Sequence, residues 1–377
     1  MTVHHGFVLI LSAVWLAAAP AADKPALPLA SPAAQQMLKD LLAEYNKGVE
    51  GLRREMMQKM SPYEVNQRLW TEGPFERLAH FGPRFLALAR QNPRTDVAWK
   101  SVRWVVYVRG FSKADKAAAL EQMLRDHLAD DEFYGDLFQH LYRPGVDVET
   151  FYREVLKRPN APRRVAGLAC YSLAVWLKSH GEKETNEALR LLQRVRAEYA
   201  DLPHPYDLKR GTLGDAAERA SFEIERLQIG QSAPEIAGAD LDGKRFRLSD
   251  FRGKVVMLVF CGDWCGPCRK LYPFEHKWSH ELVDRPFAIV GVNSDSSDKL
   301  RAAIEREKFP FRWFADGSTL GPISSRWNVE LWPTVYVLDK QGTIRMKKLG
   351  VAKPDEIKTL VDQLLAEPNA SGNRSLK

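Results

Sequence analysis

The chain has 377 residues, of which 45% are hydrophobic, and a formal net charge of +7. This length is typical of about two domains, and the composition is that of a soluble globular protein rather than of a fibrous or disordered one. Because Lys and Arg are interspersed with Asp and Glu, we interpret the positive charge as a solvated surface and expect no nucleic-acid partner.

An apolar segment near the N-terminus predicts a signal peptide over residues 1–21. Its apolar part, Phe7–Ala19, is interrupted only by Ser12 and is shorter than the about 20 residues that a bilayer-spanning helix needs. Ala19–Ala21 provides the small residues of a cleavage site, so we expect an exported protein, periplasmic or secreted. No Lys or Arg precedes Phe7, and an uncleaved N-terminus that anchors the protein to the membrane is therefore the alternative.

Residues 31–226 are predicted to form an all-α helical domain, because apolar residues recur there at intervals of three and four. Residues 88–104 resemble 156–174, and 118–130 resemble 189–201, which favours paired helices stacked in a repeat array. Cys170 lies on an apolar helix face and is expected in the core. We expect four aromatic residues to pack between helices, a protein docking groove being the alternative; they are Trp99, Trp104, Tyr107 and Trp176.

Residues 228–366 change to strands that alternate with helices, which predicts an open α/β sheet with helices on both faces. The expected elements are a hairpin of 235–240 with 244–248, a strand at 255–260, a helix from 267, a strand at 287–292, a helix at 297–308, a strand at 311–314, a hairpin of 334–338 with 344–349 and a helix at 354–366. The small and polar residues 367–377 are predicted to be a disordered tail.

A Cys-x-x-Cys pair follows shortly after the apolar run Val255–Phe260, at the point where a buried strand gives way to a helix. Unpaired backbone N–H groups and the positive end of the helix dipole stabilise a thiolate at that place. Cys265 is therefore predicted to be the nucleophile. Cys268 lies one helical turn further along, where it can attack a mixed disulfide formed at Cys265 and release the reduced substrate.

Two other interpretations of the pair are half of a zinc site and a structural disulfide. Zinc needs four ligands, commonly from two paired clusters, whereas the remaining cysteines, Cys170 and Cys261, belong to no second cluster. The four cysteines are also too few for a disulfide scaffold in a chain of this length. We therefore predict that Cys265 and Cys268 form a redox-active disulfide, and we expect neither a metal nor a cofactor.

Further motifs of the C-terminal region resemble the thioredoxin superfamily. They are the pentapeptide at 264–268, Pro273 and the strand-opening segment Trp332–Thr334. The stretches GQSAPEIAGADLDGKRFRLSDFRGKVVMLVF and WNVELWPTVYVLDKQGTIR are most similar to its exported TlpA and ResA-type branch of thiol-disulfide oxidoreductases, or redoxins. The resemblance covers residues 228–366 and implies an α/β thioredoxin-like fold behind the helical region.

The resemblance also implies roles for single residues. Cys265 matches the exposed attacking cysteine, Cys268 the resolving one, and Pro333 a cis-proline that faces the disulfide. The supporting residues are Trp264, which shields the pair, Gly266 and Pro267, which favour a reductant over a strong oxidant, Trp332 and Thr334 beside the cis-proline, and Pro273, which kinks the helix.

Two acidic residues of the family are missing. Val259 stands where thioredoxins keep a buried Asp, and Leu271 stands where the ResA-like branch keeps a Glu. Glu275, two turns beyond Cys268, is a candidate substitute, but we favour a solvated glutamate on the helix face, with proton transfer through water. Cys261 is expected to be a small buried residue at the strand end, an alternative disulfide or a regulatory thiol being the other interpretation.

These patterns favour an exported thiol-disulfide oxidoreductase, specifically a disulfide reductase. Its expected partners are protein disulfide substrates and a thiol or membrane electron donor that regenerates the dithiol. One alternative is a helical protein-binding module with a structural or vestigial redoxin domain. The other is a peroxiredoxin-like peroxidase, although Gly262 occupies the Thr position of the Pro-x-x-x-Thr-x-x-Cys pattern of that class.

Overall fold

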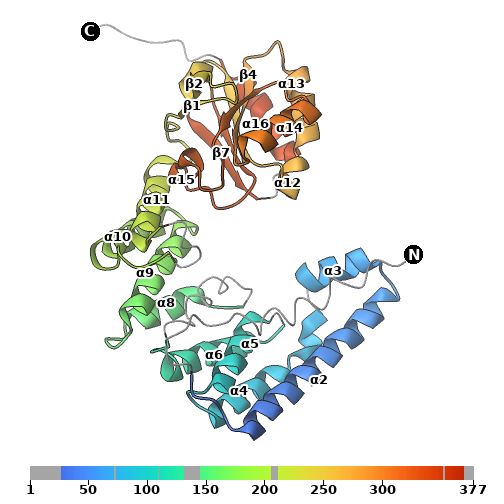
Figure 1. Cartoon of the computed structure of the whole chain (residues 1–377), viewed down its shortest axis with the longest axis vertical. Helices are drawn as coiled ribbons and strands as arrows, with labels where there is room; N and C mark the ends of the chain where they lie inside the picture. The colour runs from blue at the N-terminus through green and yellow to red at the C-terminus, as the bar shows by residue number, and fades with distance from the viewer. Residues whose placement is uncertain are drawn as a thin grey trace. The chain divides into compact units, whose positions relative to one another are not determined.

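The computed structural model of the chain describes residues 27–71, 74–108, 110–130, 145–204, 211–350 and 353–368. The described residues from Leu27 to Asp147 belong to one compact unit and those from Val148 to Pro368 to another (Figure 1). The signal peptide predicted at 1–21 and residues 369–377 lie outside the described residues.

The first unit is helical in its described part. Its helices are α2 (Pro32–Met57), α3 (Pro62–Thr71), the 3-10 helix η2 (Pro74–Leu78), α4 (Phe81–Gln91), α5 (Asp96–Tyr107) and α6 (Lys113–Asp126). Side-chain oxygens cap several N-termini; Ser31, for example, accepts a hydrogen bond from the Ala34 backbone N–H. The ring of Tyr45 on α2 packs edge-on against the rings of Phe81 and Trp104 at centroid distances of 5.5 and 5.7 Å, so Trp104 on α5 packs between helices as predicted.

The second unit begins with four more helices, which are α8 (Val148–Leu156), α9 (Arg163–Lys178), α10 (Glu182–Glu198) and α11 (Leu213–Arg226). The internal resemblance seen in the sequence relates α4–α5–α6 to α8–α9–α10, because 88–104 and 156–174 each span a helix–turn–helix. Cys170 on α9 is fully buried, which confirms its expected place in the core, and burial raises the pKa of its thiol to about 12.

The helical region predicted as one domain at 31–226 is therefore divided between the two units. Among the described residues, the boundary between the two units falls along the chain between Asp147 and Val148, rather than at the change from helices to strands near residue 227. The physical reason is that the end of α11 is built into the core of the sheet: Leu227 is fully buried in the same apolar cluster as Phe260 and Tyr336.

A five-stranded sheet forms the centre of residues 228–368, which we call the sheet domain. Its order is β5 (Arg312–Ala315), β4 (Phe287–Asn293), β3 (Val255–Cys261), β6 (Thr334–Leu338) and β7 (Ile344–Leu349). β3, β4 and β5 are parallel, whereas β6 is antiparallel to both β3 and β7. A separate hairpin joins β1 (Ala237–Ala239) to β2 (Arg245–Arg247) and is shorter than predicted.

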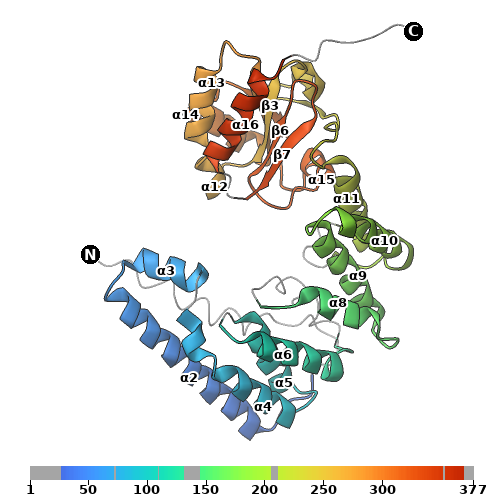
Figure 2. The same ribbon diagram turned by 180° about the vertical axis from the view of Figure 1, so that it is seen from behind.

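The helices of the sheet domain lie mostly on one face. α12 (Gly266–Arg269), α13 (Tyr272–Glu281), α14 (Ser297–Glu307) and α16 (Pro354–Ala366) contribute to or flank one apolar cluster (Figure 2). The opposite face is covered by the hairpin, the 3-10 helix η4 (Leu248–Phe251), the short helix α15 (Pro322–Arg326) and the end of α11. Helices were expected on both faces of the sheet. On the second face, the structure has only short helices and the end of α11.

Two further boundaries differ from the prediction. The helix expected from 267 is two helices, because Pro273 lacks a backbone N–H and lies at the start of α13 rather than inside one continuous helix. Glu367 belongs to the fold rather than to the tail predicted at 367–377, because its carboxylate accepts a hydrogen bond from Arg345 and its carbonyl accepts one from Lys340.

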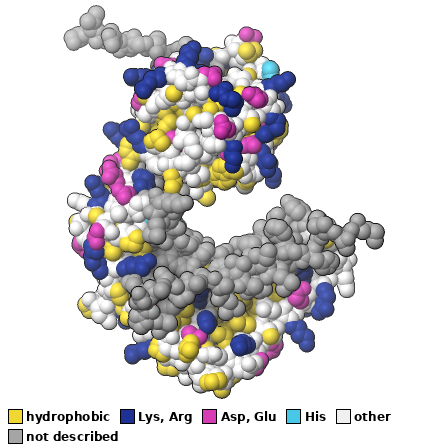
Figure 3. Space-filling model, in the orientation of Figure 1, with side chains coloured by type: hydrophobic (Ala, Val, Ile, Leu, Met, Phe, Trp, Pro, Cys, Tyr) yellow, Lys and Arg dark blue, Asp and Glu magenta, His cyan; other side chains and the backbone are white. Residues whose placement is uncertain are grey.

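Basic and acidic side chains are interspersed on the visible face of the sheet domain, with apolar patches between them (Figure 3). In the part of the chain that the structure describes, none of the helices has both the length and the apolar character of a membrane span.

Candidate active site

Cys265 and Cys268 form a disulfide, with their Cα atoms 5.2 Å apart. Cys265 is the N-cap of α12, and its Sγ accepts a hydrogen bond from the backbone N–H of Cys268 at 3.2 Å. Because α12 spans only Gly266–Arg269, its contribution comes from the N–H groups of this first turn rather than from a long helix dipole. The same N–H is placed to stabilise a thiolate on Cys265 when the bond is reduced.

The sheet brings a second segment beside the disulfide. Phe260, near the end of β3, pairs with Thr334, the first residue of β6. The preceding peptide bond, Trp332–Pro333, is cis, as the resemblance implies. The Thr334 hydroxyl donates to the Leu331 carbonyl at 2.7 Å, and the Pro333 carbonyl accepts from the Gly350 N–H at 2.8 Å, so both ends of this turn are held.

Both cysteines are buried, which corrects one expectation. Cys265 was expected to be exposed, yet it is 3% exposed and Cys268 is 1% exposed. The apolar cluster that contains both sulfurs is covered in part by Trp332, whose ring lies 5.9 Å from the ring of Trp264. Trp264 itself is 55% exposed, so at this rim the indoles rather than the sulfurs meet the solvent.

Three polar residues at the end of β4 hold the segment that leads to Cys265. The Ser294 hydroxyl accepts from the Trp264 indole N–H at 3.1 Å and donates to the Cys261 carbonyl. The Asp295 carboxylate accepts from the Asp263 N–H at 2.7 Å, and Asn293 accepts from the Asp295 N–H. Sequence reasoning missed this group, although three polar residues directly after a buried run of a parallel strand are a signal of this kind.

Gly262 is required by this arrangement, whereas Gly266 is not. A Cβ atom at position 262 would lie 2.3 Å from the Trp264 Nε1 and 2.7 Å from the Ser294 Oγ. A threonine therefore does not fit there while Trp264 keeps its hydrogen bond to Ser294. A Cβ at Gly266 would meet nothing within 4 Å, and Pro267 beside it is exposed, so the dipeptide between the cysteines is not set by packing.

Glu275 is buried, and the expectation of a solvated glutamate is wrong. It lies on the same face of α13 as Tyr272 and Trp278, one turn to either side, and these rings belong to the apolar cluster of the two cysteines. The residue is 1% exposed, and its Oε2 has no hydrogen-bond partner among the described residues. Burial raises the pKa of this carboxyl to about 8.

Cys261 lies buried at the end of β3 as a free thiol, as expected for a small strand-end residue. Burial, and after it the negative charge of Glu275, raises the pKa of the Cys261 thiol well above its ordinary value. The Glu275 carboxyl is thus electrostatically coupled to a sulfur that is in the same cluster as Cys265 and Cys268. Within the described ranges no group of His, Cys, Asp and Glu side chains is arranged to hold a metal.

Comparison with known proteins places this site in a family. A model of the AhpC/TSA family matches residues 229–347. Thioredoxin-like protein YneN of Bacillus subtilis is 33% identical over 140 residues, which are 36% of this chain and 80% of that protein. The chain belongs to the thioredoxin-like redoxin family. Thiol-disulfide oxidoreductase ResA of Bacillus anthracis is 28% identical over 151 residues, covering 39% of this chain and 85% of the relative.

A solved structure of a secreted thiol-disulfide isomerase from Corynebacterium glutamicum covers 36% of this chain and 86% of its own, with 26% identity and a TM-score of 0.34. The family model lies within the sheet domain, which we now call the redoxin domain. The chain is therefore a thioredoxin-like oxidoreductase whose described cysteine pair forms a disulfide.

The buried Glu275 makes stability depend on pH. Its pKa is near 4.5 in an unfolded chain and about 8 in the fold, because burial disfavours the charged form. The contribution of the protonated carboxyl to folding stability is therefore complete below pH 4.5 and is lost as the pH rises through about 8. Glu275→Gln should remove this dependence, and between pH 4 and pH 9 the variant should gain on the order of 4 kcal/mol relative to wild type. Urea unfolding of both proteins at each pH measures this; a stability difference that does not change with pH would contradict it.

Proposed function

We propose that this protein is an exported thiol-disulfide reductase in which Cys265 is the nucleophile and Cys268 the resolving thiol. The observation that carries the proposal is the disulfide at the first turn of α12, with the Cys268 N–H on the sulfur of Cys265 and the cis Trp332–Pro333 bond beside it. Export is supported by the apolar segment and small residues of 1–21. An uncleaved membrane anchor is the alternative for that segment.

The reduced protein acts in two steps. The Cys265 thiolate attacks one sulfur of a substrate disulfide, the substrate S–S bond breaks, and one substrate thiolate leaves while a mixed disulfide forms. The Cys268 thiol then loses its proton and attacks the Cys265 sulfur, which releases the second substrate thiolate and leaves the Cys265–Cys268 disulfide. The substrate is reduced by two electrons, and an external thiol or membrane donor returns them to the pair.

We propose that Glu275 accepts the proton that the Cys268 thiol loses in the second step. This role for Glu275 is supported by its burial beside Tyr272 and Trp278, which belong to the apolar cluster of the two cysteines, and by the electrostatic coupling of Glu275 to Cys261. A carboxyl with a pKa of about 8 is close to matching a thiol, so a proton moves between them at little cost. Glu275 then takes the place of the acids that are absent at Val259 and Leu271.

Protein disulfides are the proposed substrates. The cis-proline turn leaves backbone groups beside the disulfide, and Leu331 and Trp264 on its rim are 54% and 55% exposed, which suits an extended protein segment. The helical repeats are the proposed docking part for a protein partner. A binding module with an inactive redoxin domain is less favoured because both cysteines and the cis-proline turn are intact.

A peroxiredoxin-like peroxidase is disfavoured by Gly262. That class needs Thr or Ser three residues before its cysteine, and here Trp264 and Ser294 occupy the space that such a side chain would fill.

Removal of either sulfur should separate the two cysteine roles. Insulin reduction with dithiothreitol as the reductant should fall to the uncatalysed rate in Cys265→Ser. Cys268→Ala that has been reduced and then freed of dithiothreitol should instead accumulate a mixed disulfide between Cys265 and the insulin chain, because neither Cys268 nor an external thiol is present to resolve it. Cys261→Ser is the matched control and should keep its activity. Wild-type turnover in Cys265→Ser would leave only the binding role for this domain.

Loss of the Glu275 carboxyl should slow resolution. In single-turnover experiments with reduced protein, Glu275→Gln should form the mixed disulfide at the wild-type rate and resolve it at least about tenfold more slowly. Glu281→Gln, at an exposed glutamate on the same helix, is the control. Equal resolution rates in the two variants would remove Glu275 from the mechanism.

A further inference from the structure

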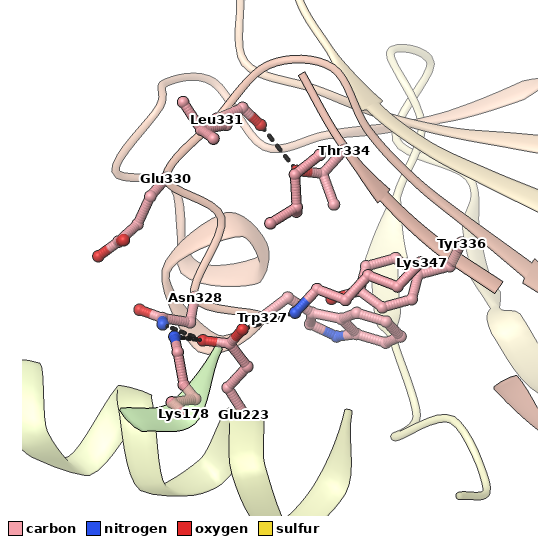
Figure 4. A pocket seen from close by; sticks show the side chains of 10 residues that line it. Lys178, Glu223, Trp327, Asn328, Glu330, Leu331, Thr334, Tyr336 and Lys347 are labelled. Atoms are coloured by element: carbon pink, nitrogen blue, oxygen red, sulfur yellow. Dashed lines mark hydrogen bonds and ion pairs between the residues drawn. The ribbon is translucent and has the colours of Figure 1, made fainter. Parts of the chain in front are cut away.

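A buried ion cluster joins the helical repeats to the redoxin domain. Glu223 on α11 is 7% exposed, and its Oε2 accepts from Lys178 Nζ on α9 at 2.5 Å while its Oε1 accepts from Lys347 Nζ on β7 at 2.6 Å. Oε2 also accepts from the Asn328 side-chain amide at 2.5 Å. Figure 4 shows these groups converging on the one carboxylate.

The charges of this cluster keep Glu223 ionised. Burial alone would raise the pKa of Glu223, but Lys178 and Lys347 outweigh it and lower that pKa to about 2. The carboxylate therefore persists as the pH falls well below neutral, and its stabilising effect is lost only as the pH falls through about 2. Hydrogen bonds to an ionised acceptor are shorter and stronger than neutral ones, so each partner of Glu223 is firmly held.

The surroundings of α11 fix this carboxylate relative to the sheet. The guanidinium of Arg326 lies over the ring of Phe222 at 5.5 Å, and Leu227 is fully buried in the core of the redoxin domain. The segment after α11 pairs with the start of β7: the Gly230 N–H donates to the Ile344 carbonyl and the Ile344 N–H to the Gln231 carbonyl, each at 2.8 Å. α11 and the segment after it are thus attached to the redoxin domain at several points.

The cluster lies directly beneath the cis-proline turn. A cavity of about 70 Å³ is lined by Glu223, Lys178 and Lys347 on one side and by Leu331 and Thr334 on the other (Figure 4). The chain from Asn328 to Pro333 carries that turn, and it is anchored at its start by the buried Trp327 and by the contact of Asn328 with Glu223. Asn328 has a φ of 49°, a left-handed conformation in which asparagine is among the few tolerated residues.

We propose that Glu223 is a positioning residue for the redox site: a carboxylate supplied by α11, the helix that follows the repeats, holds Asn328 and thereby sets the place of the Leu331–Thr334 segment that receives a protein substrate. The inference rests on the proposed function. It gives the helices before the redoxin domain a part in substrate recognition, since the segment next to the disulfide is connected through Glu223 to α11 and to Lys178 on α9. Small disulfides need no extended binding along this segment, so their reduction depends much less on the contact between Glu223 and Asn328.

Asn328→Gly tests this contact, because glycine adopts the observed φ freely while the amide is lost. For insulin reduction the KM should rise about three- to tenfold with kcat within about twofold, as expected for the loss of one hydrogen bond that orders a binding segment. The rate with 5,5′-dithiobis(2-nitrobenzoate) should stay within about twofold of wild type, as for a reaction that needs no extended binding along the segment. Lys308→Gly, at another residue of positive φ in the redoxin domain, is the matched control.

Glu223→Gln should also raise the insulin KM. If the loss of this buried charge prevents folding, the result with Asn328→Gly alone tests the proposal. An insulin KM for Asn328→Gly equal to that of Lys308→Gly would overturn the proposal, and so would equal slowing with insulin and with the small disulfide. A wild-type protein that reduces neither compound would instead overturn the proposed function on which it rests.

Discussion

The active site depends on the pairing of β3 with β6. This pairing joins two segments that are far apart in the chain: β3 ends at Cys261 shortly before the disulfide, and β6 begins at Thr334 directly after the cis-proline. The register places Phe260 opposite Thr334. Every residue of β3 is buried, so a slip of one residue would exchange the side chains of two well-packed faces, which makes the register strongly specified.

Two buried glutamates in the second unit illustrate how environment assigns opposite properties to one residue type. Glu275 has an apolar surrounding and no partner for Oε2, so its pKa is raised to about 8 and it exchanges a proton near neutral pH. Glu223 faces two lysines, so its pKa is lowered to about 2 and it stays charged. The first suits the proposed proton transfer from Cys268, and the second suits a permanent electrostatic connection between helices α9 and α11 and the redoxin domain.

Local patterns in the sequence predicted most of the redoxin domain. The strands at 255–260, 287–292 and 334–338 and the helix at 354–366 agree with the structure to within one residue at each end, because apolar runs and flanking turn residues mark them clearly. The cysteine pair lies at a strand-to-helix junction as predicted, since its position follows from the adjacent run alone.

Contacts between distant segments were not predictable in this way. The partners of Glu223 are 45, 105 and 124 residues away, and no local periodicity relates them. The burial of Glu275 depends on where α13 begins, at Tyr272 with Pro273 in its first turn, because this start sets which face of the helix is buried. The low exposure of Cys265 likewise depends on Trp332, which reaches it only through the β3–β6 pairing.

The central claim is that Cys265 and Cys268 exchange electrons reversibly as a reducing pair. A redox titration against dithiothreitol buffers, read by thiol alkylation, measures it directly. The account predicts a single two-electron transition with a midpoint near that of reducing members of this fold, about −270 mV. A pair that cannot be reduced and reoxidised, or a midpoint near the about −120 mV of strong oxidants, would contradict it.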